Sequence, residues 1–106
     1  MIRSFPDRVY TVVAFIPPGK VVSYGQIARY IQAPQSSRQV GWAMHNCPKG
    51  LPWHRVLKKT GTLPFPVGSI EFITQKELLE AEGVLFQSDD SVDMKQYEWN
   101  IETSED

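Results

Sequence analysis

The chain has 106 residues, of which 42% are hydrophobic, and its formal net charge at pH 7 is -1. This length fits one domain with a modest core, and the composition excludes an intrinsically disordered chain. The longest apolar run, residues 9–16, is too short to cross a bilayer, and no signal-peptide pattern is present at the amino end, so we expect a soluble intracellular protein without a membrane partner.

Charge is distributed unevenly along the sequence. Residues 1–60 contain nine Lys or Arg and one acid, a charge of +8, whereas residues 61–106 contain two Lys and eleven acids, a charge of -9. Attraction to phosphates depends on local potential, so this split indicates a basic binding face and an acidic far side; chance clustering on a solvated surface is the alternative. The single cysteine, Cys47, cannot form an internal disulfide or a metal cluster, and we expect no metal and no cofactor.

Two amphipathic helices are predicted first. Apolar residues recur at helical spacing over residues 5–16, and the Pro-Pro-Gly at 17–19 ends the pattern. The second helix begins after Ser23, which forms a capping-box pattern with Gln26, and it ends before Pro34.

A third helix is predicted directly afterwards. Ser36 begins it, and Gln39 completes a second capping-box pattern. Its apolar face comes from Val40, Ala43 and Met44. Two short helices joined by a tight turn after a core helix are typical of a helix-turn-helix DNA-binding motif, although many small helical domains share this pattern.

The outward face of the third helix carries Arg38, Gly41, Trp42 and His45 at helical spacing. A glycine inside a helix costs about 1 kcal/mol relative to alanine, so Gly41 indicates the close approach of another backbone. A nucleic-acid strand would supply that backbone. The alternative is packing against a neighbouring element of the same chain, especially for Trp42.

A hairpin or wing is predicted over residues 55–65, because short apolar segments flank a Thr-Gly turn. Pro64 and Pro66 then predict a loop that continues through Gly68 and Ser69.

The last predicted helix follows this loop. Thr74 and Glu77 form a third capping-box pattern at its start. Leu78 and Leu79 would pack inward, and Gly83 would end the helix.

The carboxyl-terminal segment combines alternating apolar residues with acidic ones. Tyr97, Trp99 and Ile101 alternate and predict a terminal strand or a cover over the core. Residues 88–93 form a polar loop, and residues 102–106 an acidic, disordered tail that follows a single domain at 1–101.

Four segments resemble one known family in order and spacing. They are IPPGKVVSYGQIA at 16–28, RQVGWAM at 38–44, PWHRV at 52–56 and KELLEAEGV at 76–84. Together they are similar to the carboxyl-terminal domain of the 6-O-alkylguanine DNA alkyltransferases over about residues 5–84. The resemblance implies a mainly α fold with small β elements (α+β), a single winged helix-turn-helix-like domain.

The family's loop has the sequence Pro-Cys-His-Arg-Val, whose cysteine accepts the alkyl group from a damaged guanine flipped out of the duplex. Trp53 stands in that place here, as in the alkyltransferase-like proteins, which transfer nothing. Alkyl transfer needs a nucleophile, and the indole lone pair belongs to the aromatic ring. The ring instead suits stacking on a flipped base, worth roughly 1 to 3 kcal/mol, or it is an aromatic plug that fills the space.

The resemblance also implies a DNA-binding face. Tyr24 matches the tyrosine that crowds the phosphate beside the target nucleotide, and Arg38 matches the arginine that enters the minor groove and fills the gap left by the flipped base. Ser36 and Ser37 lie where the helix amino end approaches the DNA backbone. The expected set is Tyr24, Ser36, Ser37, Arg38, Gly41 and His45.

The expected lesion pocket is lined by Pro52, Trp53, Val67, Gly68 and Ser69. The segment PFPVGSI makes the pocket rim less polar than in alkyltransferase-like relatives, which tend to carry basic residues there.

His54 and Glu82 match the pair that, with a bridging water, polarises the family's cysteine. We expect both to support the loop by hydrogen bonds, with Arg55 as a further anchor; a catalytic remnant is the alternative. Cys47 occupies the place of a family asparagine that braces the loop, and Asn46 is one residue early.

The interpretation is a non-enzymatic DNA damage sensor, a cytoplasmic monomer that is nucleoid-associated if bacterial or nuclear if eukaryotic. Its expected partners are double-stranded DNA containing alkylated guanine and, as the resemblance implies, nucleotide excision repair proteins. The acidic part, residues 71–106, is either the face for that partner or a solvated surface. The rival functions are a residual alkyltransferase that uses Cys47 and a helix-turn-helix transcription regulator that prefers a base sequence rather than a lesion.

Overall fold

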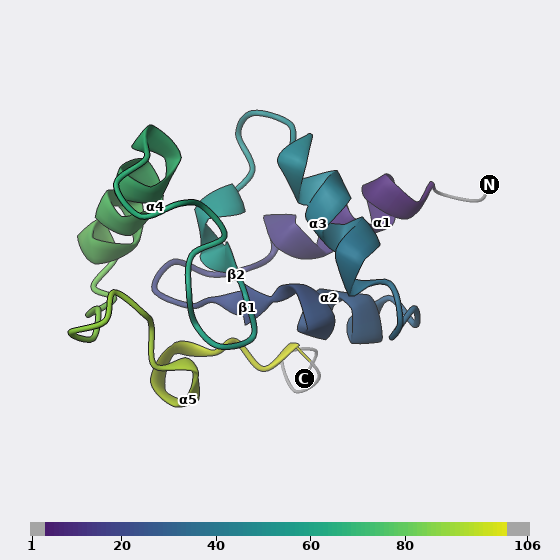
Figure 1. Cartoon of the computed structure of the whole chain (residues 1–106). Helices are drawn as coiled ribbons and strands as arrows, with labels where there is room; N and C mark the ends of the chain where they lie inside the picture. Colours follow the sequence, from purple (N-terminus) through teal and green to yellow (C-terminus); the bar gives the residue numbers. More distant parts are fainter. Residues whose placement is uncertain (1–3, 102–106) are drawn as a thin grey trace.

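A computed structural model describes residues 4–101 of the chain (Figure 1). Its helices are α1 (Phe5–Ala14), α2 (Tyr24–Tyr30), α3 (Ser37–His45), the 3-10 turn η1 (Trp53–Arg55), α4 (Ile70–Ala81) and α5 (Met94–Tyr97). The strands β1 (Val22–Ser23) and β2 (Val56–Leu57) form a parallel pair. The fold is mainly α with small β elements, as predicted. The predicted tail at 102–106 lies outside the described residues.

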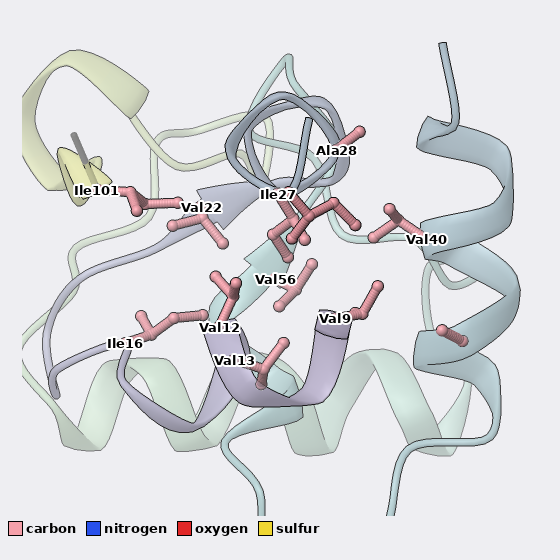
Figure 2. Packing of buried hydrophobic residues seen from close by; sticks show 12 residues of the cluster. Val9, Val12, Val13, Ile16, Val22, Ile27, Ala28, Val40, Val56 and Ile101 are labelled. Atoms are coloured by element: carbon pink, nitrogen blue, oxygen red, sulfur yellow. The ribbon is translucent and has the colours of Figure 1, made fainter. Parts of the chain in front are cut away.

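The first core lies among α1, α2 and α3. Side chains from these helices and from both strands point toward one another (Figure 2). The buried members are Val9, Val12, Val13, Ile16, Val22, Ile27, Ala28, Ile31, Val40, Ala43, Val56 and Ile101. Each large aliphatic side chain buried in this way stabilises the fold by about 1.5 to 3 kcal/mol. The helical spacing predicted for the first three helices is therefore confirmed.

A second core lies on the other side of the two strands, against α4 and the carboxyl-terminal segment (Figure 1). Its buried members are Val21, Leu57, Leu63, Phe72, Leu79, Val84 and Val92. Successive strand residues point to opposite faces, which explains why Val22 and Val56 join the first core while Val21 and Leu57 join the second.

The capping box of α2 is confirmed. The Ser23 side chain accepts from the Gln26 N–H at 3.1 Å, and the Gln26 side chain accepts from the Ser23 N–H at 2.9 Å. The second predicted box is wrong: Ser36 is the N-cap residue of α3, but its side chain makes no capping hydrogen bond. The backbone of Ser36 has φ -109° and ψ 24°, which is not the extended conformation that directs a side-chain oxygen at the first turn.

The start of α4 also differs from the prediction. Ser69 caps this helix, with its side chain accepting from the Phe72 N–H at 3.1 Å, so Thr74 lies inside the helix and the predicted cap there is wrong. Ser69 has the extended backbone that a cap needs, five residues earlier. Leu79 is buried as predicted, but Leu78 is 38% exposed, because adjacent helical residues point about 100° apart. Gly83 ends the helix at φ 94°, as predicted.

The predicted hairpin at 55–65 is wrong. β2 pairs in parallel with β1 instead, with Val22 opposite Val56. Only a turn follows β2, in which the Lys58 N–H donates to the Thr62 carbonyl at 3.1 Å. The chain turns at Gly61, where φ is 86° and an added Cβ would collide with the Val92 carbonyl.

The carboxyl-terminal segment is a cover, not a strand, within residues 96–101. Asp93 caps the single turn α5 by accepting from the Lys95 N–H at 3.0 Å, which makes the residues after it helical. Val21 then forms one parallel bridge with Glu98. Trp99 packs against the first core, so the predicted cover is confirmed. No helix of the described part of the chain is long and apolar enough to cross a membrane.

Candidate nucleic-acid interface

The loop that contains Trp53 is fixed at both ends. Pro52 precedes η1, and the Trp53 N–H donates to the Leu51 carbonyl at 2.8 Å. η1 leads directly into β2, whose Val56 is paired with β1. The backbone of the tryptophan is thereby held next to the paired strand β2.

Glu82, at the carboxyl end of α4, organises this loop. Its Oε2 lies 2.7 Å from His54 Nε2 and 2.6 Å from Arg55 Nη2, and its Oε1 accepts from the Gly19 N–H at 3.0 Å. Arg55 Nη1 also donates to the Ile16 carbonyl at 2.7 Å. The structure thus brings together the three residues predicted to support the loop.

The carboxylate of Glu82 remains ionised over a wide pH range. Burial alone would raise its pKa, but hydrogen bonds from Arg55, the Gly19 N–H and His54 outweigh burial and lower the pKa to about 2. Because the carboxylate accepts, His54 Nε2 carries a proton in this contact. Nothing in this arrangement presents a nucleophile, and its geometry is that of a brace.

A cavity of about 150 Å³ opens beside Trp53. It is lined by Tyr24, Gly41, Met44, His45, Trp53, Val56, Pro64, Phe65 and Gln75. Mostly apolar walls with a few polar groups are typical of sites that bind small flat molecules, and an engineered apolar cavity of about 150 Å³ accepts benzene. The cavity is therefore suited to an aromatic ring.

The aromatic wall of the cavity has a defined geometry. The Trp53 ring meets Phe65 edge to face, with centroids 6.1 Å apart and planes at 82°. It meets His54 in the same manner, at 6.1 Å and 85°. Edge-to-face contacts of this kind hold a ring in one orientation, so one face of the indole can remain available to a ligand.

Tyr24 and Gln75 contribute polar groups to the wall. Burial raises the pKa of Tyr24 to about 12, so its hydroxyl keeps its proton and can donate. Gln75 is fully buried, and its Nε2 donates to the His54 carbonyl at 3.0 Å and to the Val56 carbonyl at 3.2 Å. Sequence reasoning missed Gln75, although its spacing from Phe72 places it on the buried stripe of α4.

The predicted lesion-pocket residues are only partly gathered in this cavity. Trp53 lines it, whereas Pro52, the N-cap residue of η1, is not among the lining residues. Val67 is 78% exposed, and neither it nor Gly68 is among the lining residues. Ser69 caps α4. Their role in a pocket stays a prediction, and Pro64 and Phe65 from the same loop line the cavity instead.

The outward face of α3 borders the cavity. Gly41 and His45 line it, and a Cβ added at Gly41 would meet no heavy atom within 4 Å. No neighbouring element of the described chain therefore requires a glycine there. Trp42 is 69% exposed, so the alternative that it packs against a neighbouring element is wrong.

A basic groove adjoins the cavity and shares Tyr24 with it. The groove has a volume of about 910 Å³ and is lined by Ser23, Tyr24, Gly25, Gln26, Arg29, Ser37, Arg38, Lys58, Lys59 and Glu98. Four of these side chains are cationic and one is acidic, which suits a phosphate backbone. The predicted residues Ser37 and Arg38 lie here, and Ser36 lies next to them as the N-cap of α3. Sequence reasoning missed Arg29, Lys58 and Lys59 as members of this site. The pair of adjacent lysines directly after β2 was a signal that could have found two of them.

Cys47 lies apart from both features. It is half-buried just after α3, it does not line the cavity, and burial raises the pKa of its thiol. Asn46 does not brace the loop, because its Nδ2 donates to the Trp42 carbonyl within α3 at 3.1 Å. Residues 4–101 contain no group of three or more His, Cys, Asp or Glu side chains that could hold a metal ion.

Comparison with known proteins decides the family. Residues 4–84 match the model of the 6-O-methylguanine DNA methyltransferase DNA-binding domain. The chain belongs to this family. The alkyltransferase resemblance inferred from the sequence is thereby confirmed.

Two relatives of this alkyltransferase-family chain carry names that concern DNA or alkyl transfer. The Escherichia coli (strain K12) DNA base-flipping protein is 39% identical over 99 residues, which are 92% of this chain and 75% of the relative. Alkyltransferase-like protein 1 of Schizosaccharomyces pombe is 47% identical over 83 residues, 76% of this chain and 77% of the relative.

Solved structures agree with the family assignment. The crystal structure of S. pombe Atl1 in complex with damaged DNA containing O6-carboxymethylguanine matches with a TM-score of 0.80 at 38% identity. That match covers 93% of this chain and 99% of Atl1. The O6-methylguanine methyltransferase of Mycobacterium tuberculosis matches at a TM-score of 0.66 and 36% identity, over 77% of this chain and 50% of the enzyme.

Proposed function

We propose that this protein is a non-enzymatic sensor of DNA damage, which binds 6-O-alkylguanine in duplex DNA by flipping the nucleotide into the cavity beside Trp53. The observation that carries the proposal is an aromatic-walled cavity bordering a basic groove. The cavity would take the base and the groove the phosphate backbone. The relative Atl1, solved with DNA containing O6-carboxymethylguanine, supports this function.

The absence of alkyl transfer follows from the chemistry of Trp53. Indole offers no free lone pair for attack on an alkyl carbon. Cys47 is the single cysteine of the sequence, and its half-buried thiol with a raised pKa lies away from the cavity lining. A thiol with a raised pKa is a poor source of thiolate, which argues against a residual alkyltransferase.

Flipping needs groups that displace the nucleotide and replace it in the stack. Tyr24 stands between the cavity and the groove, where its hydroxyl can press on the phosphate beside the target nucleotide. Arg38 is exposed in the first turn of α3 and can occupy the vacated position, which offsets the few kcal/mol lost on unstacking. The start of α3, which lacks a side-chain cap from Ser36, suits a phosphate.

The rival function, a sequence-specific regulator, fits the site less well. A regulator of this class uses the exposed face of its recognition helix for base edges in the major groove. Here Gly41 and His45 on that face border a cavity formed with the Trp53 loop. A regulator has no need of such a cavity.

A sensor that does not repair must pass the lesion to other proteins, and we propose the nucleotide excision repair machinery as that partner. The support is a surface on α4 where the acidic Glu71 and Glu77 accompany the exposed Ile70 and Ile73. Apolar side chains with a charged surround are typical of protein-binding surfaces. Such a sensor would act as a monomer wherever the DNA lies, at the nucleoid or in the nucleus.

Binding titrations at one fixed, moderate salt concentration test the proposal. We expect a duplex with a single 6-O-methylguanine to bind at least about tenfold more tightly than the same duplex with guanine. Arg38→Ala and Tyr24→Ala should lose this preference, whereas Lys95→Ala on α5 should keep it. The mass of the protein should stay unchanged after incubation with the lesion. Equal affinity for the two duplexes, or a covalent gain in mass, would refute the proposal.

A further inference from the structure

Trp42 presents a large apolar surface to solvent. Of the three tryptophans in the sequence, all of them within residues 4–101, it alone is exposed, at 69%. Its main-chain carbonyl accepts a hydrogen bond from Asn46 Nδ2 at 3.1 Å, which does not involve the indole ring. The ring lines neither the cavity nor the basic groove. Single exposed apolar side chains are common on protein surfaces, so the position of this ring decides what it can do.

Trp42 shares its side of α3 with residues that the proposed function places against DNA. Arg38 lies one turn earlier on the same side, where the Cβ atoms of residues four apart are about 5 to 6 Å from each other. Arg38 lines the basic groove, whereas Gly41 and His45, which flank Trp42 in the sequence, line the cavity. A duplex that occupies both the groove and the cavity therefore crosses the face of α3 from which the ring projects.

The surroundings of the ring suit a nucleic acid. The α3 sequence, residues 37–45, contains no acidic side chain, so nothing on this helix repels a phosphate backbone. A Cβ added at Gly41 would meet no heavy atom of the described chain within 4 Å, so the glycine leaves room for a duplex to approach the helix closely. An aromatic ring beside a cation is the combination by which proteins hold bases next to their phosphates. The occupant of this face is therefore the base stack of the duplex.

The spacing between Arg38 and Trp42 determines which base step the ring reaches. Four residues of an α-helix rise by about 6 Å, whereas successive base pairs are stacked about 3.4 Å apart. With Arg38 in the place of the flipped nucleotide, the ring meets the duplex less than two steps away. The step between the first and second base pairs next to the lesion is centred about 5 Å from the lesion, which falls within this distance.

We propose that Trp42 is an apolar wedge, which enters the base stack beside Arg38 and partly unstacks the step between the first and second base pairs next to the lesion. Apolar side chains inserted between base pairs act in this way in proteins that kink DNA. The energetic cost depends on the step, and pyrimidine–purine steps such as TA separate most easily. Trp42 therefore makes the affinity for a lesion depend on its flanking sequence. This role rests on the proposed function, because Arg38 takes the vacated position only when a nucleotide is flipped.

The test compares two duplexes of identical base composition. Both carry 6-O-methylguanine (X) between the same neighbours, one in 5′-TAXTA and the other in 5′-AAXTT, so the step under test is TA on both sides in the first duplex only. We expect wild type to bind the TA duplex at least about fivefold more tightly, the low end of the effect of one unfavourable base pair. Trp42→Ala should reduce this ratio to less than about twofold. Dividing one ratio by the other removes differences that belong to the DNA alone.

Two further variants isolate the role of the ring. Trp42→Phe keeps a flat apolar wedge and should retain most of the wild-type ratio. Phe15→Ala removes an aromatic side chain that is 71% exposed directly after α1, outside the cavity and the groove, and should leave the ratio unchanged. Trp42→Ala should fold normally, because the ring is exposed and alanine is the best helix former.

Other roles for Trp42 give other results. A contact with sugars or phosphates would weaken both duplexes by the same factor in Trp42→Ala, and a surface for a protein partner would weaken neither. Either result leaves the ratio unchanged and overturns the inference. A loss of the ratio in Trp42→Phe as large as in Trp42→Ala would overturn it as well.

The indole ring itself provides a second measurement. Wild type labelled with 5-fluorotryptophan has one fluorine resonance for each of its three tryptophans, and labelled Trp42→Phe assigns the resonance of Trp42. The shift of this resonance between H₂O and D₂O measures the exposure of the ring to solvent. It should decrease on binding of the TA duplex, because an inserted ring is shielded. A ring that stays as exposed in the complex as in the free protein overturns the inference.

Failure of the proposed function would have a separate signature. In that case wild type binds the 5′-TAXTA duplex equally well with 6-O-methylguanine and with guanine at X, before any substitution at Trp42 is considered. Lesion preference with an unchanged flanking-sequence ratio in Trp42→Ala leaves the sensor function standing and removes the role of the wedge alone.

Discussion

Trp53 contributes a surface whose neighbours restrict its motion. Phe65 and His54 meet the ring edge to face, and η1 fixes its backbone. A ring held in advance loses little conformational entropy when a base stacks on it, which strengthens binding. Under the proposed function, Trp53 is therefore well suited to increase the affinity for a flipped base.

Replacement of Trp53 by alanine should separate a stacking surface from an aromatic plug. The loss of one base–aromatic stack, worth roughly 1 to 3 kcal/mol, should weaken binding of a 6-O-methylguanine duplex about 5- to 150-fold. Undamaged duplex should change much less, because the basic groove is intact. Fluorescence anisotropy measures the binding. Phe15→Ala, which removes the exposed aromatic side chain directly after α1, serves as the control. A lower melting temperature with unchanged lesion preference would show that Trp53 is a plug.

Glu82 should determine the acid stability of the loop. Its pKa is about 2 in the folded protein and near 4.5 when unfolded, so its carboxylate contributes stability above about pH 4.5 that is lost as the pH falls toward 2. Thermal unfolding should show a melting temperature that decreases in this window for wild type and less steeply for Glu82→Gln. Glu77→Gln, at an exposed position of α4, should follow the wild-type profile. Parallel profiles for wild type and Glu82→Gln would contradict this assignment.

At the scale of elements, caps decide where the helices begin. Ser23 both ends β1 and caps α2, which leaves no flexible residue between strand and helix. Ser69 performs the same task for α4 directly after the loop that borders the cavity. The starts of these helices are thereby fixed at the edges of the site.

The cap at Ser69 can be tested against the one predicted at Thr74. Ser69→Ala should lower the free energy of unfolding by about 1 kcal/mol, since the Phe72 N–H loses its acceptor. Thr74→Ala, an exposed change inside α4, should alter it by less than about 0.5 kcal/mol. Urea denaturation measures both. A larger effect at Thr74 than at Ser69 would place the helix start where the sequence pattern alone puts it.

Hydrophobic periodicity was sufficient to predict α1, α2 and α3, because each carries a buried stripe of its own. The strand pair could not be predicted in the same way. Strands of two residues have no periodicity, and their pairing joins segments more than thirty residues apart. The cap of α4 was missed because Thr74 and Glu77 fit the capping-box pattern, whereas Ser69 is followed three residues later by Phe72; the extended backbone of Ser69 is what identifies it as the cap.

For the whole molecule, the uneven charge of the sequence becomes a spatial arrangement. Arg29, Arg38, Lys58 and Lys59 meet in one groove, although they come from two helices and a turn. α4 carries acidic residues on the far side of the two strands from α1, α2 and α3 (Figure 1). A duplex that approaches in the wrong orientation therefore meets a repulsive surface, which favours encounter through the groove.

The salt dependence of binding should identify the phosphate contacts. Lys58→Ala and Lys59→Ala should each reduce the slope of log K against log salt concentration by about 1 if that lysine contacts a phosphate. The loss of affinity should be similar for damaged and undamaged duplex, since phosphates carry no information about the lesion. Lys95→Ala, outside the groove, should leave the slope unchanged. Unaltered slopes in both groove variants would remove this turn from the interface.

The parts of the candidate site that depend on the chemistry of single residues could be predicted from the sequence. The parts that depend on how helices and loops pack together could not. The structure brings His54, Arg55 and Glu82 into contact and places Trp53 on the cavity wall, and the roles that the resemblance implies for them stay predictions. Gln75 carries no such motif, because its place in the cavity results from the packing of α4 against η1.

The parallel pair of β1 and β2, although each strand has only two residues, determines the relative positions of the segments that flank it. Its register places Ser23 opposite Leu57. Tyr24 directly follows β1, and η1 directly precedes β2. The spacing between Tyr24 and Trp53 is consequently fixed by backbone pairing and is independent of which side chains line the cavity. Substitutions in the lining can change which base is accepted while the opening keeps its width, and this separation would allow lesion preference to diverge among relatives without rebuilding the fold.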